Sequence, residues 1–119
     1  MKKLEPNQRK IANIYETPFR PWDLESNVSI GESILQLNAT KPDGIGFHIY
    51  KMAPGTTTIP HRHTGDEEYL LIEGDLTEND GTALKPGDVV WFKSGTEHCS
   101  STVNGCTLAV YIEKVEERT

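Results

Sequence analysis

The chain has 119 residues, a net charge of −6 and a hydrophobic share of 35%, which suits one domain with a single hydrophobic core. The negative charge argues against a nucleic-acid partner, because phosphate binding requires a stripe of basic residues and the lysines and arginines here are scattered. No run approaches the roughly 20 apolar residues of a membrane span, and the polar first ten residues lack the apolar segment of a signal peptide, so we expect a cytoplasmic protein.

Residues 1–27 are expected to form an irregular N-terminal arm ahead of a single domain at 28–119. The stretch T-P-F-R-P-W-D within this arm contains two prolines, which exclude a regular helix there. Phe19 and Trp22 are large apolar side chains that are costly to leave in water. They must therefore dock on their own domain or on a second subunit, and the sequence leaves both alternatives open.

From Val28 onward the chain has the pattern of an all-β fold, with short apolar or alternating runs separated by Gly, Pro, Asn and Asp. The run V-V-W-F at 89–92 is apolar throughout and predicts a strand that is buried on both faces. Asn104-Gly105 is a strong hairpin signal and predicts that segments 99–103 and 106–112 pair as neighbouring strands. About eight to ten short strands in this length fit a jelly-roll β-barrel made of two sheets.

The two cysteines, Cys99 and Cys106, do not make a disulfide framework. The predicted hairpin would place Cys99 opposite Val110 and Cys106 opposite Val103, so the two thiols would not face each other. We therefore expect free thiols, which suits a reducing compartment.

Three potential metal-binding side chains lie close together in the stretch H-R-H-T-G-D-E. His61 and His63 are two residues apart, so in an extended strand both project from the same face. Glu67 keeps this parity if the intervening turn adds no slip, whereas Glu68 would point outward into solvent. His98 supplies a third imidazole from a distant segment. Three imidazoles and a carboxylate suit one divalent transition metal ion, such as Fe, Zn, Ni or Mn.

These motifs resemble those of the cupin superfamily, also called RmlC-like proteins. The first cupin motif is matched at each fixed position by Gly55-x5-His61-x-His63-x3-Glu67-x6-Gly74, and most of the second by Gly87-x5-Lys93-x-Gly95-x2-His98. Lys93 stands where the family usually has proline, and Thr102 where it has asparagine. More narrowly, the chain is similar to the cupin of ChrR-type anti-sigma factors and to acetylacetone-cleaving and dihydroxyacetophenone-type dioxygenases. The resemblance covers roughly residues 17–112.

The resemblance implies the double-stranded β-helix of cupins, with His61, His63, Glu67 and His98 as the metal ligands. Coordination requires neutral histidine and ionised glutamate, so metal affinity should fall below about pH 6. Four protein ligands leave one or two positions open for water, a chelating small molecule or dioxygen. We expect mostly apolar pocket walls, with the inward-facing candidates Tyr50, Met52, Tyr69, Leu71, Val90, Phe92 and Tyr111.

Three further residues near these motifs were assigned roles from their position on a strand. Tyr69 lies two residues after Glu67 on the same side, so it is the best candidate for a phenolic hydrogen-bond donor in the pocket, with plain core filling as the alternative. His48 is expected to be a satisfied histidine of a sheet and not a metal ligand. Cys99 follows His98 directly, so it should point away from the metal as a small buried side chain.

Two functions fit this ligand set. The first is a mononuclear metalloenzyme, an Fe(II)-type dioxygenase acting on a small diketone or a phenolic ketone. The second is a metal-dependent sensor or regulatory binding module, as the resemblance to the ChrR cupin implies. In that family the cupin follows an N-terminal helical domain that grips the sigma factor, so a regulator built on this chain would need that domain on another chain. The enzyme is the favoured prediction.

A homodimer is the expected assembly. The runs Y-L-L-I and V-V-W-F place apolar side chains on both faces of their strands, more than one barrel interior of this size accommodates. A second subunit is therefore expected to cover an outer sheet face, and related small cupins usually form dimers.

Overall fold

The computed structural model describes the backbone of residues 1–24 and 27–119 and the side chains of 1–22 and 31–119. The described chain is built of short strands, after one 3-10 helix, η1 (Pro6–Gln8). No helix in these residues is long and apolar enough to cross a membrane. The strands are β1 (Arg20–Leu24), β2 (Asn27–Leu35), β3 (Gly46–Met52), β4 (His61–Arg62), β5 (Glu67–Gly74), β6 (Leu76–Glu78), β7 (Ala83–Leu84), β8 (Val89–Phe92), β9 (Glu97–His98), β10 (Ser100–Ser101), β11 (Cys106–Ile112) and β12 (Glu117–Arg118).

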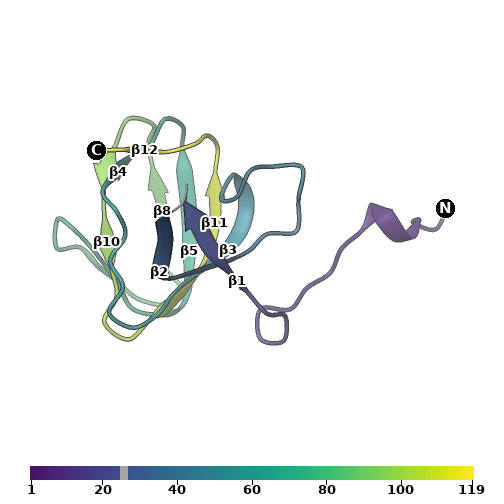
Figure 1. Cartoon of the computed structure of the whole chain (residues 1–119), viewed down its shortest axis with the longest axis horizontal. Helices are drawn as coiled ribbons and strands as arrows, with labels where there is room; N and C mark the ends of the chain where they lie inside the picture. Colours follow the sequence, from purple (N-terminus) through teal and green to yellow (C-terminus); the bar gives the residue numbers. More distant parts are fainter. Residues whose placement is uncertain (25–26) are drawn as a thin grey trace.

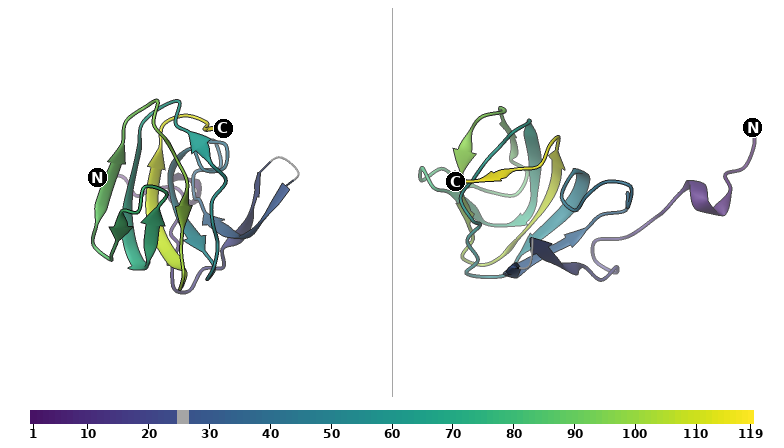
Figure 2. Two further views of the ribbon diagram at one scale, coloured as in Figure 1. Left: turned by 90° about the vertical axis from the view of Figure 1, so that its left-hand side faces the viewer. Right: turned by 45° about the horizontal axis from the view of Figure 1, so that its top comes forward.

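The strands form one large sheet and two small ones. The six-stranded sheet has the order β1-β2-β3-β11-β5-β8, and the small sheets have the orders β10-β6-β7 and β12-β4-β9. Figure 1 shows β4, β10 and β12 on the left of the body and β5, β11 and β3 further to the right, and Figure 2 shows the strands enclosing an interior from two other directions. The predicted all-β jelly-roll β-barrel is therefore confirmed.

The core is lined by alternate residues of the large sheet. On β5, Tyr69 and Leu71 are 4% and 0% exposed, whereas the intervening Leu70 is 38% exposed. This alternation follows from the pleat, which sends successive side chains to opposite faces. β11 lies between β3 and β5 and supplies the centre of the inner face. The buried cluster comprises Tyr50, Met52, Tyr69, Leu71, Leu76, Cys106, Leu108, Val110 and Ile112.

The two adjacent leucines of β5 give a matched test of this packing. Leu71→Ala is expected to lower the free energy of unfolding by about 2–5 kcal/mol, because it leaves a cavity in the core. Leu70→Ala should cost about 1 kcal/mol or less, since that side chain is partly in solvent. Urea unfolding of the two variants measures both values, and equal costs would contradict the inward placement of Leu71.

The prediction that V-V-W-F is buried on both faces is wrong. β8 is the edge strand of the large sheet, and Val89 and Trp91 are 73% and 58% exposed on its outer face. Val90 and Phe92 face inward and pack against the core cluster. A short apolar run cannot by itself distinguish a strand covered on both sides from an edge strand with an apolar outer face.

The predicted hairpin around Asn104-Gly105 is also wrong. β10 pairs with β6 in a small sheet, whereas β11 pairs with β3 and β5 in the large one. The turn therefore carries the chain from one sheet to the other, and Asp75 accepts hydrogen bonds from the backbone N–H groups of Val103 and Asn104, both at 2.8 Å. Gly74 lies against this crossing, where a Cβ would sit 2.0 Å from the carbonyl oxygen of Gly105.

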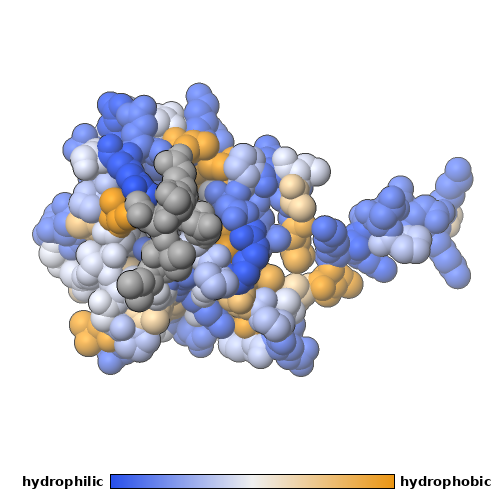
Figure 3. Space-filling view, in the orientation of Figure 1, coloured by the Kyte–Doolittle hydropathy of each residue, from blue (hydrophilic) through white to orange (hydrophobic). Residues whose placement is uncertain are grey.

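The N-terminal segment differs in part from the irregular arm predicted for residues 1–27. Residues before β1 project away from the body, and their tip is mainly hydrophilic (Figures 1 and 3). β1, however, pairs with β2 in the large sheet, so the predicted boundary between residues 27 and 28 falls inside β2. Residues 25 and 26, which connect the two strands, lie outside the described part of the chain. Trp22 packs on the core of its own domain. The Lys51 ammonium lies 4.2 Å from the centre of the Phe19 ring.

Candidate metal centre

A short ladder between two strands brings three histidines together. β4 pairs with β9 so that His61 lies directly opposite His98. The backbone N–H of His63 donates to the Thr96 carbonyl at 2.9 Å, and the N–H of Gly95 donates to the His63 carbonyl at 2.7 Å. Thr96 Oγ1 lies 3.5 Å from Nδ1 of the His63 ring. The histidine pair at 61 and 63 is thereby held beside the distant third histidine.

The four predicted ligands converge at one place. One ligand atom from each of His61, His63, Glu67 and His98 can be chosen so that all lie within 4.8 Å of one another. The Nε2 atom of His98 lies 2.9 Å from that of His61 and 3.0 Å from that of His63. Two nitrogens that are each about 2.1 Å from a single ion and bind at a right angle are about 3 Å apart. Glu67 Oε1 lies 3.1 Å from Nε2 of His63. The donor set therefore fits one divalent transition metal ion.

The outer nitrogens of two histidines are engaged by acceptors. Nδ1 of His61 lies 2.7 Å from the Ile59 carbonyl oxygen, and Nδ1 of His98 lies 2.7 Å from Oε2 of Glu78. These oxygens only accept hydrogen bonds, so each Nδ1 carries the proton and donates it. Both Nε2 atoms are thereby directed toward the cluster and are the nitrogens available to an ion, the arrangement that orients metal-binding histidines.

Glu78 is a functional residue that the sequence analysis missed. Its side chain is 7% exposed and accepts hydrogen bonds from the hydroxyl groups of Tyr69 at 2.9 Å and Ser100 at 2.9–3.0 Å, in addition to the His98 ring. The expected role of Tyr69 is corrected by this contact, because its proton is already donated to Glu78 and is not free for a ligand. Glu78 precedes the turn N-D-G, so its sequence context resembles that of a solvated loop residue.

Glu78→Gln is expected to weaken metal binding by about 10- to 100-fold, because outer carboxylates orient the bound histidine and raise its basicity. Glu97→Gln, at an exposed position beside His98, is the control and should leave the affinity unchanged. Competition titration with a chromogenic chelator measures both variants. An unchanged affinity in Glu78→Gln would show that Glu78 does not support the site.

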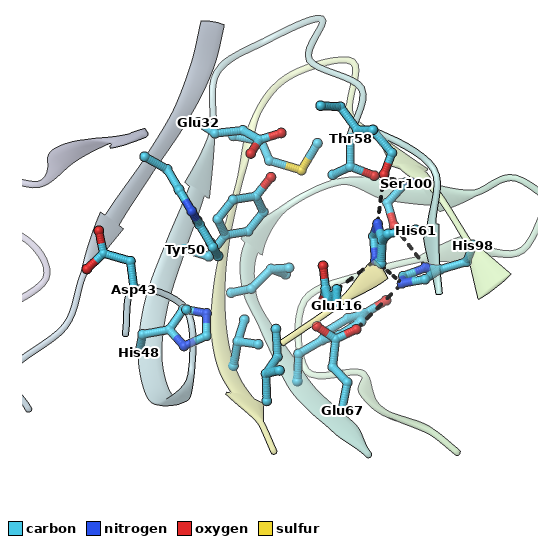
Figure 4. Close-up of a pocket in the computed structure, with 18 of the residues that line it drawn as sticks. Glu32, Asp43, His48, Tyr50, Thr58, His61, Glu67, His98, Ser100 and Glu116 are labelled. Carbon is cyan, nitrogen blue, oxygen red and sulfur yellow. Dashed lines mark hydrogen bonds and ion pairs between the residues drawn. The ribbon is translucent and has the colours of Figure 1, made fainter. Parts of the chain in front are cut away.

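Glu116 is a second carboxylate that the sequence analysis missed. β12 pairs with β4, which draws the C-terminal segment across the histidines. Oε1 of Glu116 lies 3.6 Å from Nε2 of His61 and 3.7 Å from Nε2 of His63, and Figure 4 shows Glu116 next to His61. Burial and the charge of Glu67 raise the pKa of Glu116 to about 7. No motif marks this residue, because its position depends on how the tail folds back.

Charges within the cluster shift several pKa values. Burial alone would raise the pKa of Glu67, but hydrogen bonds and charges from His63 and His98 outweigh it and hold this pKa at about 2. Burial lowers the pKa of His61, which favours the neutral ring that binds metal. For His98, burial is outweighed by Glu67 and Glu78, and the pKa rises to about 9 in the metal-free protein.

A cavity of about 480 Å³ extends from the cluster into the barrel. Its volume is in the range of small-molecule sites. Its walls include metal-cluster residues together with Tyr50, Met52, Tyr69 and several aliphatic side chains. Tyr50, Met52 and Tyr69 thus lie where the sequence analysis expected them.

Other predicted wall residues lie elsewhere. Leu71 belongs to the core cluster, and Val90 packs against it. The Phe92 ring packs against the histidines, with centroids 4.2 Å from His98 and 5.4 Å from His63. The expectation for Tyr111 is wrong, because this residue is 50% exposed on the outer face of the sheet. Tyr111 lies opposite the outward-facing Glu68 of β5, and this register between β11 and β5 could not be read from the sequence.

Of three residues beside the ligands, one lies as expected and two only in part. Glu68 is exposed, as predicted, whereas Cys99 is outside the metal cluster but only partly buried. His48 is also outside the cluster and is 1% exposed, but it lines the same cavity and only one of its ring nitrogens is bonded. The prediction of a satisfied histidine is therefore wrong for Nε2.

The loop before His98 is ordered without the usual cupin proline. Thr96 donates to the Lys93 carbonyl from both its backbone N–H, at 3.2 Å, and its hydroxyl, at 2.8 Å. The carboxylate of Asp66 accepts a hydrogen bond from the backbone N–H of Ser94 at 2.9 Å and one from the Trp91 indole at 3.2 Å. Side-chain hydrogen bonds thus replace the rigidity that proline would supply.

A jelly roll that gathers three histidines and a glutamate beside an internal cavity defines a cupin with a site suited to a single metal ion. The family described as "ChrR Cupin-like domain" matches residues 8–116. The chain belongs to this family, as its motifs predicted.

Curated relatives have varied names and are longer than this chain. The chain is 35% identical over 77 residues to a proposed dimethylsulfoniopropionate lyase, DddL, of Cereibacter sphaeroides, covering 62% of this chain and 32% of that protein. It is 26% identical over 104 residues to small ribosomal subunit protein uS4 of Chromobacterium violaceum, covering 85% of this chain and 49% of that protein. The chain thus spans between a third and a half of these relatives.

Solved structures confirm the fold. An acetylacetone dioxygenase from Acinetobacter johnsonii superposes with a TM-score of 0.68 and 16% identity, covering 92% of this chain and 77% of that one. The structure of Rhodobacter sphaeroides SigE in complex with the anti-sigma ChrR gives a TM-score of 0.62 and 16% identity, covering 82% of this chain and 49% of that one. At these identities the similarity establishes the jelly roll alone.

Proposed function

We propose that this protein is a mononuclear metalloenzyme, an Fe(II)-type dioxygenase acting on a small diketone or a phenolic ketone. The observation that carries the proposal is that the four-residue cluster opens into a cavity of about 480 Å³ whose walls are largely apolar. Such a cavity accepts a small organic molecule with its oxygen end at the cluster. The fold shared with an acetylacetone dioxygenase supports the same reaction class.

The residues of the chain have separable roles in this proposal. His61, His63 and His98 would hold the ion through their Nε2 atoms, His98 after its ring has released a proton, and Glu67 supplies one negative charge. A bound divalent ion would provide Lewis acidity and, as iron(II), access to dioxygen chemistry. Glu116 Oε1 lies beside the cluster with a pKa of about 7, so it can hold or release a proton next to a bound ligand near neutral pH. Aliphatic side chains that line the cavity, among them Leu108, Val110 and Ile112, would contact the apolar part of a ligand.

Oxygen uptake tests the dioxygenase directly. Protein reconstituted with iron(II) under anaerobic conditions is expected to consume dioxygen with at least one member of a panel of diketones and hydroxyaryl ketones, whereas Glu67→Ala should not. No uptake by fully loaded protein would count against the proposal. The panel should include dimethylsulfoniopropionate, because release of dimethyl sulfide without oxygen uptake would replace the oxidative reaction with an elimination like that named for DddL.

A metal-dependent sensor or regulatory module is the alternative, and membership of the ChrR cupin-like family favours it specifically. In this case the cluster and cavity would bind metal and ligand to change a partner interaction, without turnover. Affinity capture with metal-loaded protein distinguishes the two functions. Recovery of a sigma factor that depends on the metal would support the sensor, and recovery of only the protein itself would leave the enzyme as the better proposal.

We also propose a homodimer. Large side chains are exposed on the outer face of the large sheet, where Trp91 pairs across from Glu68 and Val89 across from Leu70. A second subunit that covers this face would remove them from water. Trp91→Lys is expected to dissociate the dimer in sedimentation experiments at micromolar concentration, whereas Lys85→Glu, at an exposed position beyond β7, should not. A monomeric wild-type protein would exclude the dimer.

The cytoplasm remains the proposed compartment. Cys99 and Cys106 are free thiols, as the sequence analysis expected. Thiols that stay reduced suit a reducing environment. Fractionation of cells that express the full-length protein would test this placement.

A further inference from the structure

The end of the cavity opposite the metal cluster contains buried polar atoms without partners. His48 and Trp22 both line the cavity, and Figure 4 shows the His48 ring facing it from the side opposite His61 and His98. His48 Nε2, Trp22 Nε1 and the Tyr50 hydroxyl are buried and have no hydrogen-bond partner among the described residues, and all three side chains line this cavity. Buried polar groups are normally paired, so three such atoms around one cavity call for an explanation. His48 and Trp22 differ from Tyr50 because each has only one bonding role to fill.

The two atoms have opposite hydrogen-bonding character. His48 Nδ1 lies 3.0 Å from the Gly46 carbonyl oxygen, which only accepts, so Nδ1 carries the ring proton. Nε2 of His48 is therefore an acceptor, because burial lowers the pKa of this histidine and keeps the ring neutral. The indole N–H of Trp22 is a donor only. A donor and an acceptor without partners thus belong to side chains that line the same cavity.

Packing fixes this pair in place. The Trp22 ring stands nearly perpendicular to the His48 ring, with centroids 5.7 Å apart, and to the Tyr50 ring, with centroids 5.5 Å apart. Gly44 makes room for the indole, since a Cβ there would lie 2.4 Å from Trp22 Cζ2. The donor and the acceptor are therefore held by neighbouring rings and do not depend on a mobile side chain.

The charge of the cavity narrows the class of group that this end would bind. The walls on the His48 side include the carboxylates of Glu32 and Asp43, so an anionic group is disfavoured at this end (Figure 4). A neutral hydroxyl group has both the donor that His48 Nε2 lacks and the acceptor that the Trp22 indole lacks. A ketone oxygen could pair only with the indole, and an ammonium group only with the histidine.

We propose that Trp22 and His48 form a hydroxyl-binding subsite at the end of the cavity opposite the metal cluster. The ligand class is then a small molecule with an oxygen group at the cluster, an apolar middle and a hydroxyl group at the far end, such as a hydroxyaryl ketone. This inference deepens the proposed function and rests on it for the cluster-bound end of the ligand. The subsite itself depends only on Trp22 and His48.

The experiment uses the two tryptophans of the chain as reporters. Trp22 lines the cavity and its Nε1 has no partner, whereas Trp91 Nε1 donates to Asp66 at 3.2 Å and serves as the internal control. Zinc-loaded, ¹⁵N-labelled protein is titrated with 4-hydroxyacetophenone and with acetophenone. The hydroxylated ketone is expected to bind about three- to tenfold more tightly, because this is the gain in affinity that one net hydrogen bond provides. It should also shift the indole signal of Trp22 but not that of Trp91.

Variants separate a hydroxyl contact from a general effect on binding. Trp22→Phe and His48→Phe should each remove the preference for 4-hydroxyacetophenone while acetophenone binds as before. Trp91→Phe is the matched control and should retain the preference. Should one cavity variant fail to fold, the other still decides the result. Equal affinity for both ketones with an unshifted Trp22 signal overturns the subsite. Trp22 and His48 would then pair only with water.

Phenol distinguishes failure of the subsite from failure of the proposed function, because it carries the hydroxyl group and lacks the ketone. If neither ketone binds but phenol shifts the Trp22 signal in wild-type protein and not in His48→Phe, the subsite stands and the ketone substrate is wrong. If phenol also leaves the Trp22 signal unchanged, the subsite is overturned.

Discussion

Glu67→Ala is expected to lower the metal affinity by more than about 100-fold. This loss exceeds the one typical of residues that only hydrogen-bond to a metal ligand. Glu67 is the anionic member of the cluster, and its Oε1 lies 3.1 Å from Nε2 of His63 and 3.6 Å from Nε2 of His98. Its removal would leave three neutral nitrogens with no compensating charge for a divalent ion. Equilibrium dialysis followed by elemental analysis measures the loss.

Glu68→Ala is the matched control for this variant. The two glutamates are neighbours on β5, yet one is buried in the cluster and the other is exposed on the outer face. Removal of Glu68 changes the net charge from −6 to about −5, as removal of Glu67 does, and should leave metal binding intact. Equal losses in both variants would show that overall charge, and not coordination by Glu67, governs the affinity.

Metal affinity is expected to fall by about 100-fold or more between pH 7 and pH 5. The pKa of His98 is about 9 in the metal-free protein, so this ring is protonated at both pH values and must release its proton to bind an ion. One proton released for each ion corresponds to a tenfold loss of affinity for each unit of pH below about 9. Glu67, with a pKa of about 2, stays ionised over this range and does not add to the loss.

Calorimetric titration at pH 7 in buffers of different ionisation enthalpy counts the released protons. We expect about one proton or more for each ion bound. Chelator competition across the pH range then gives the slope of affinity against pH. A flat profile with no proton release would mean that His98 is not a ligand or that its ring is neutral before the ion binds.

The metal-free protein should show the opposite dependence on pH. Because the folded pKa of His98 is raised above its ordinary value of 6.5, its contribution to stability is fully present below pH 6.5 and is lost as the pH rises through about 9. The lowered pKa of Glu67 stabilises the fold above its ordinary value of 4.5 and loses this effect as the pH falls toward 2. Thermal unfolding with and without metal separates the two trends.

The sequence by itself determined the fold class and the four residues of the cluster. Turn residues at short intervals set the strands, and fixed spacing placed His61, His63 and Glu67 on one side of the chain. These features are local, since strand parity and turn conformation depend on neighbouring residues. For the same reason Glu68 could be assigned to the outer face without a structure.

Only the tertiary structure decided which strands are neighbours and which distant side chains meet. Pairings between segments far apart in the chain decide three features. They make Asn104-Gly105 a connection between two sheets, leave one face of β8 exposed and place Tyr111 on the outer face. Glu78 and Glu116 reach the histidines for the same reason, one through β6 and the other through β12. A short-range sequence pattern contains no information on such contacts, because their energy arises only once the barrel has closed and water is excluded from its interior.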